Sequence, residues 1–121
     1  MTPVALVVAV LACVAIAVIG VRFLLKPTAA TRDFGVQPDD ARALTAIKGV
    51  RDVTSGVVPM VVWAVAGVPA LGWALIAASI TPWADMGIVL ARDGKRATAF
   101  GVHGLTAALL VVVGVALVTS A

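Results

Sequence analysis

Polar residues at helical spacing interrupt an otherwise apolar stretch of the chain. Lys48, Arg51, Asp52 and Ser55 recur at intervals of three and four, so they would share one face of an α-helix. Lys48 and Asp52 can pair across one turn. Arg51 and Asp52 are adjacent and diverge by about 100° around a helix, which favours partners for them on other helices.

Two more ionisable residues, Asp85 and His103, fall inside later apolar runs. Such a group is costly in a membrane unless it is paired, and it is a functional hypothesis by default. Two carboxylates bridged by a cation can divide the work of epoxide opening, because one protonates the leaving oxygen and the other activates water. Asp52 and Asp85 would be this pair, with Arg51 or Arg22 between them and His103 relaying protons or orienting water.

The two carboxylates are expected to play opposite roles. Asp85, with no cation nearby in the sequence, is predicted to be the acid, and Asp52, beside Arg51 and one turn from Lys48, the base. Neither a cofactor nor a metal is expected, because the chain has no glycine-rich phosphate loop, Cys/His metal spacing or nucleophile elbow. The residues expected to support the site or bind substrate are Arg22, Asp33, Lys48, Ser55 and Trp83.

A structural interpretation of the same residues stays open. Arg22, Lys48 and Arg51 could snorkel to the membrane interface, with Asp52 as their counter-ion. His103 could be a helix-packing histidine. The function hypothesis is favoured for Asp85 and His103, because both lie about six residues inside their spans, at a matched depth of roughly 9 Å.

The elements that must position these residues are membrane helices. Of the 121 residues, 62% are hydrophobic and 12% are charged, against about 45–50% and 25% in soluble domains. This composition argues against a soluble globule and against disorder. It predicts a single all-α domain over residues 1–121, whose solvent is the lipid bilayer.

Four apolar runs are each long enough to cross a hydrocarbon core of about 30 Å. They predict helices at approximately residues 4–25, 39–66, 70–91 and 97–118. The first is interpreted as a retained span, because it lacks the basic start of a signal peptide. Pro27 is expected to end it, residues 67–69 to form a short turn between antiparallel helices, and Pro82 to kink the third helix. The predicted fold is an integral membrane four-helix bundle.

The charges predict the orientation of this bundle. The nine Lys and Arg residues exceed the six Asp residues by three, and all nine fall at one end of the predicted helices. The positive-inside rule then places the 26–37 and 92–96 loops in the cytoplasm and both termini outside the cell (inner) membrane. The excess of basic residues is therefore interpreted as a sign of membrane topology rather than of nucleic-acid binding, and no nucleic-acid partner is expected. The expected partners are the bilayer and a hydrophobic small molecule, with a homodimer left open.

The sequence is also compatible with two function classes other than an enzyme. Small four-helix exporters depend on a glutamate in the first helix, whereas this chain has no Glu and no acid before Arg22. Proton-coupled transport through Asp85 remains an alternative. A non-catalytic structural subunit is a further alternative, although such a subunit does not need a charged layer. The lone Cys13 supplies neither an intrachain disulfide nor two-cysteine chemistry.

Several short motifs together resemble a known family. They are Arg22-Phe23, residues 30–35, 48–52 and 71–73, Thr81-Pro82 with Asp85, and residues 99–104. The chain resembles, over nearly its whole length, a family of small four-helix membrane proteins of bacteria and fungi classed as a domain of unknown function. The resemblance implies the four-helix membrane fold. Some fungal relatives accompany polyketide pathways in which small membrane proteins open epoxides or promote cyclisation, so it also implies a hydrolase or cyclase of natural-product biosynthesis.

Overall fold

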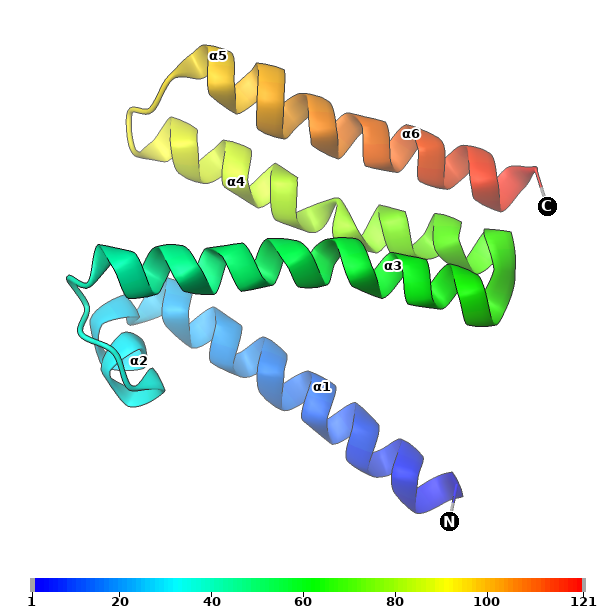
Figure 1. Cartoon of the computed structure of the whole chain (residues 1–121), viewed down its shortest axis with the longest axis horizontal. Helices are drawn as coiled ribbons and strands as arrows, with labels where there is room; N and C mark the ends of the chain where they lie inside the picture. Colours follow the sequence, from blue (N-terminus) through cyan, green and yellow to red (C-terminus); the bar gives the residue numbers. More distant parts are fainter. Residues whose placement is uncertain (1, 121) are drawn as a thin grey trace. The chain divides into compact units, whose positions relative to one another are not determined.

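The computed structural model describes residues 2–120, which are helical almost throughout (Figure 1). The helices are α1 (Thr2–Leu25), α2 (Pro27–Phe34), α3 (Ala41–Ala78), α4 (Ile80–Ala91), α5 (Arg96–Thr98), the π-helix η1 (Ala99–Gly104) and α6 (Leu105–Thr119). No strand occurs in this part of the chain, which confirms the all-α prediction. The chain forms two compact units, Met1–Lys48 and Gly49–Ala121, which are described in turn.

Three helical stretches are long and apolar enough to cross a membrane: Pro3–Leu25, Ala41–Ala91 and Arg96–Thr119. A straight helix of the 51 residues in the second stretch would be about 77 Å long, far more than a hydrocarbon core of about 30 Å. This stretch is divided in two by a reversal at Gly67. The chain is therefore a membrane protein with four apolar helical segments, as the sequence predicts.

The reversal depends on the backbone of Gly67. Its φ of 83° and ψ of −173° lie in a region that only glycine adopts readily, because a Cβ would clash there. The reversal separates a first limb of α3 (residues 41–66) from a second limb (68–78), and Figure 1 shows the chain doubling back between them. This is the turn predicted at residues 67–69. The limbs run antiparallel as a result.

The second limb passes into α4 through a break at Ser79. Pro82 has no amide hydrogen, so the carbonyl of Ala78 loses the partner that a regular helix would provide. The Ser79 N–H donates to the carbonyls of Leu75 at 3.0 Å and Ile76 at 3.2 Å, and its hydroxyl donates to the Ile76 carbonyl at 2.6 Å. The helix is thus interrupted at Ser79, about one turn before Pro82.

Glycines bring the helices of the second unit close together. A Cβ on Gly72 of α3 would lie 2.7 Å from the carbonyl oxygen of Gly114 on α6. A Cβ on Gly104 of η1 would lie 2.9 Å from the Met86 sulfur on α4, and α4 also contacts α6. Small residues at these crossings allow the backbones to approach closely, as is usual between membrane helices.

The first unit contains a helix that the sequence analysis missed. Residues 26–37 were expected to be a polar connection without a helix, because Pro27 was interpreted as a terminator. Pro27 instead occupies the first turn of α2, where its missing N–H costs nothing. Gly35, with a φ of 111°, ends the helix, and its N–H donates to the carbonyls of Thr31 and Arg32. The expectation of an unstructured link is corrected on this point.

Helix α2 folds back against the end of α1. Arg22 pairs with Asp33 at 2.5 Å, and the rings of Phe23 and Phe34 meet edge to face with centroids 6.2 Å apart. Ala30 is buried in this contact. Both members of the ion pair are substantially exposed, so the pair itself adds little stability, typically 0–1 kcal/mol.

The fourth predicted helix begins and ends close to where it was expected, but its first half is irregular. Residues 99–104 form the π-helix η1, which carries His103. Single-turn π segments widen a helix by one residue and often occur at functional sites. The sequence pattern contains no sign of this widening.

Candidate functional site

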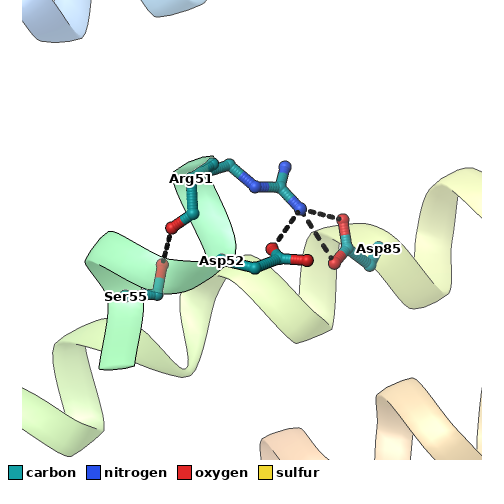
Figure 2. Close-up of polar contacts among 4 residues, drawn as sticks. All are labelled: Arg51, Asp52, Ser55 and Asp85. Carbon is teal, nitrogen blue, oxygen red and sulfur yellow. Dashed lines mark hydrogen bonds and ion pairs between the residues drawn. The ribbon is translucent and has the colours of Figure 1, made fainter. Parts of the chain in front are cut away.

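A single nitrogen of Arg51 contacts two carboxylates. Its Nη2 lies 3.4 Å from Oδ1 of Asp52 and 3.3 Å from each carboxylate oxygen of Asp85 (Figure 2). We call these three residues the bridged cluster. The distances are long for charge-assisted hydrogen bonds, which are usually about 2.7–2.9 Å. One nitrogen is thus shared among three carboxylate oxygens of two side chains.

The turn at Gly67 explains how these residues meet. Arg51 and Asp52 lie on the first limb of α3, and Asp85 lies on α4. A similar number of residues separates each from Gly67, so antiparallel packing brings them to the same level. The sequence favoured a partner for Arg51 on another helix, and Asp85 is that partner. The side chain of Arg51 also passes over Asp52, so it contacts both carboxylates (Figure 2). This is one of the two arrangements expected from the sequence, in which Arg51 or Arg22 lies between Asp52 and Asp85.

The three side chains differ in exposure. Asp85 is 18% exposed, whereas Arg51 and Asp52 are 45% and 49% exposed. The sequence-based reason for making Asp85 the acid was the lack of a cation near it. In the structure Arg51 lies 3.3 Å from Asp85 and 3.4 Å from Asp52, so contact with Arg51 does not distinguish the two carboxylates. Their exposure does distinguish them.

An open groove of about 500 Å³ lies beside Arg51. It runs between the two limbs of α3 in the second unit, and we call it the alanine groove. Its lining residues are Arg51, Thr54, Ser55, Val58 and Pro59 on the first limb and Ala74, Ala77 and Ala78 on the second. Its volume falls within the range of sites that hold small organic molecules. The bridged cluster thus adjoins a mainly apolar space.

Ser55 supports the helix rather than the carboxylates. Its hydroxyl donates to the Arg51 carbonyl at 2.9 Å, a common arrangement for serine within a helix (Figure 2). It also lines the alanine groove. Neighbouring Thr54 lines the groove as well, and the sequence analysis overlooked it because its spacing gave no reason to single it out.

Of the other predicted site residues, His103 and Trp83 belong to the second unit, and Arg22, Asp33 and Lys48 belong to the first. Among residues 2–120, His103 makes no hydrogen bond or ion pair with Asp52 or Asp85, and it is half-buried on η1. Trp83 is exposed on α4 and does not line the alanine groove. Arg22 and Asp33 pair with each other in the first unit. Lys48 lies on α3, one turn before Asp52.

The arrangement provides the parts of an acid–base site. Two carboxylates of different exposure share one cation, Arg51, and this cation lines an apolar space. Within residues 2–120, no group of three His, Cys, Asp or Glu side chains is placed to hold a metal ion. The chemistry that these side chains can supply themselves is proton transfer and charge stabilisation at an oxygen atom.

Comparison with known proteins gives one match. The family described as Domain of unknown function (DUF4267) matches residues 13–117, a range that includes every site residue named above. No curated protein and no solved structure matches the chain.

Proposed function

The chain belongs to the DUF4267 family, and we propose that it is a membrane enzyme that opens an epoxide of a hydrophobic substrate by adding water or by cyclisation. The observation that carries this proposal is the contact of Arg51 with both Asp52 and Asp85 beside a mainly apolar groove. Acid–base opening of an epoxide needs two proton-transferring groups near one apolar substrate. The bridged cluster and the alanine groove supply these together.

In the proposed reaction, Asp52 is the base and Asp85 the acid. Asp52 takes a proton from water as the water oxygen bonds to an epoxide carbon. The bond from that carbon to the epoxide oxygen breaks, and Asp85 gives its proton to this oxygen. The product is a diol, and one water molecule is consumed. A proton then passes from Asp52 to Asp85 to restore the starting state. In cyclisation, a hydroxyl group of the substrate replaces water, and the product is a cyclic ether.

The exposure of the side chains supports these roles. Asp52 is about half exposed, so water can reach it, whereas Asp85 is mostly enclosed. Arg51 touches both carboxylates and orients them, and its positive charge stabilises the developing negative charge on the epoxide oxygen. His103 receives no step in this scheme, because no contact among residues 2–120 joins it to either carboxylate.

We further propose that the protein lies in the cell (inner) membrane with both termini outside. The Lys and Arg residues fall at one end of the apolar helices, and such residues collect on the cytoplasmic side. The bridged cluster then lies in the cytoplasmic half of the membrane. A hydrophobic intermediate of natural-product biosynthesis would reach it through the lipid.

Isotope labelling of the product tests the proposed reaction. Purified protein in detergent and in lipid is incubated with a panel of apolar epoxides in water enriched in ¹⁸O. We expect a diol that carries one ¹⁸O atom even in a single turnover, because water attacks the substrate directly. Unlabelled product in that first turnover would indicate attack by a carboxylate instead. Failure to convert any epoxide in the panel would remove the support for the proposal.

The same preparation distinguishes the two alternatives. A proton-coupled transporter would change the pH inside sealed vesicles when an apolar cation is supplied, and it would leave epoxides intact. A structural subunit would do neither. The loose contacts of Arg51 and the adjoining groove favour catalysis over a structural ion-pair network, because a network that serves only stability gains most from short, saturated contacts.

A further inference from the structure

The alanine groove is polar at one end and apolar along the rest of its length. Its residues on the first limb of α3 lie on one helix face, polar from Arg51 to Ser55 and apolar at Val58 and Pro59. On the second limb it is lined only by alanines. Because the limbs are antiparallel about Gly67, Ala78 lies at the polar end and Ala74 at the apolar end.

The polar end has unused hydrogen-bond donors. Among the described residues 2–120, the carboxylate contacts of Arg51 are made by Nη2, and Figure 2 shows Nη1 turned away from both Asp52 and Asp85. The hydroxyl of Ser55 donates to a carbonyl one turn earlier in the helix, as that of Thr45 does elsewhere in α3. The hydroxyl of Thr54, in contrast, makes no hydrogen bond within residues 2–120. Arg51 and Thr54 therefore offer donors to an oxygen atom that enters this end of the groove.

The charge of the bridged cluster selects the kind of oxygen. Arg51 carries one positive charge and already contacts two carboxyl groups, so the bridged cluster has no surplus positive charge for an anion. A carboxylate or phosphate of a ligand would add a negative charge beside Asp52 and Asp85, which is unfavourable in a space of low dielectric constant. An uncharged epoxide, ether or hydroxyl oxygen avoids this repulsion.

We infer that the alanine groove binds an uncharged, elongated amphiphile, with its oxygen at Arg51 and Thr54 and its apolar body between Pro59 and Ala74. That this ligand class is also the substrate rests on the proposed function. Its binding to the groove can be measured without turnover. The small alanine side chains leave the space for the apolar body. A larger side chain at Ala74 would shorten that space and leave the polar end intact.

Chain-length preference tests this inference in the active protein. The substrates are the terminal epoxides of hexane and dodecane. We expect Ala74→Leu to lower kcat/KM for the dodecane epoxide by about 10-fold or more, because a mismatch of a few methylenes in an apolar pocket has an effect of this size. The hexane epoxide should be affected much less. Ala64→Leu, an exposed position of the same helix outside the groove, is the matched control.

Photo-crosslinking tests binding without turnover. The probe is dodecanol with a photoreactive diazirine near its apolar end, applied to the full-length protein in lipid. We expect cross-links concentrated near Val58, Pro59 and Ala74, and competition by dodecanol but not by dodecanoate. Ala74→Leu should lose these cross-links, whereas Ala64→Leu should keep them. Ala74→Val, a smaller change, replaces the leucine variant if that variant does not fold.

The outcomes separate the inference from the proposed function. The expected cross-links without conversion of any epoxide would support the ligand class and reject the hydrolysis. Epoxide conversion with the same chain-length preference in wild type and Ala74→Leu would reject the inference and keep the enzyme. Equal cross-linking along every apolar helix, or equal competition by dodecanoate, would show that the probe reports only lipid contact, which also rejects the inference.

Discussion

Arg51 and Asp85 are 34 positions apart in the sequence, yet Nη2 of the arginine lies 3.3 Å from both carboxylate oxygens of the aspartate. Because Nη2 is equally far from both oxygens of Asp85, it lies opposite the middle of that carboxylate. The same nitrogen also approaches Asp52, so one cation is shared between two acids. The position of Arg51 therefore sets the distance between the two groups to which we assign proton transfer.

Replacing Arg51 by lysine should impair catalysis although the charge is kept. An ammonium group is a point charge and lacks the planar set of donors with which a guanidinium can hold a carboxylate and a substrate oxygen together. We expect kcat/KM for an apolar epoxide to fall by about 10²–10³, the effect of losing one oriented donor. Arg96→Lys, in an exposed position near the 92–96 loop, is the control and should match wild type. A loss of thermal stability with an unchanged rate per folded molecule would indicate a structural role.

Asparagine at Asp52 or Asp85 should remove proton transfer while keeping the volume of the side chain. Each single variant is expected to lower the rate of epoxide opening by about 10²–10⁴. The double variant should be little slower than either single one, because the two groups act as a unit. Asp39→Asn, on an exposed residue before α3, is the control. Full activity in both single variants would reject the site and leave the enzyme proposal standing.

The contact between Gly72 and Gly114 should be sensitive to one methyl group. Gly72→Ala would place a Cβ 2.7 Å from the Gly114 carbonyl oxygen. We expect the free energy of unfolding in mixed micelles to fall by about 1–3 kcal/mol, the usual effect of overpacking. Gly56→Ala on the same helix meets nothing within 4 Å, so it should be neutral or should stabilise by up to about 1 kcal/mol. Circular dichroism during denaturation measures both, and equal stability of the two variants would contradict the close crossing.

Cysteine labelling tests the proposed orientation. In a Cys13→Ala background, Ser120→Cys should react with a membrane-impermeant thiol reagent in intact cells, and Lys95→Cys should react only after the membrane is opened. The reason is the concentration of Lys and Arg at the end that contains residue 95. The opposite pattern would place the bridged cluster in the outer half of the membrane.

The membrane helices could be predicted because their signals are local and strong. Long apolar runs define the four segments, Gly67 supplies the only residue type that adopts its backbone conformation readily, and Pro82 removes a helical hydrogen bond. The pairing of Asp52 with Asp85 in one site was predicted from their residue types and the expected cation between them. Each of these inferences depends on a residue and its near neighbours, so one sequence was sufficient.

The remaining features depend on contacts that a pattern does not encode. The π-helix η1 lies against α4, where Gly104 meets Met86, and nothing in its own residues requires the widening. The pairing of Arg51 with Asp85 depends on how two antiparallel limbs face each other. Helix α2 is different, because Pro27 at its start and Gly35 at its end are signals in the sequence itself. Pro27 was interpreted as the end of the first helix, and Gly35 was not used.

The turn at Gly67 also affects how the protein is made. In the proposed orientation residues 67–69 cross the bilayer during insertion, and because they carry no charge, this step moves no ionised side chain across it. The 51 residues from Ala41 to Ala91 are then suited to leave the insertion machinery as one hairpin, with both limbs together. Arg51 and Asp85, one on each limb, would neutralise each other during that step. A charge placed at Val68 would interfere with biogenesis before it could affect any reaction.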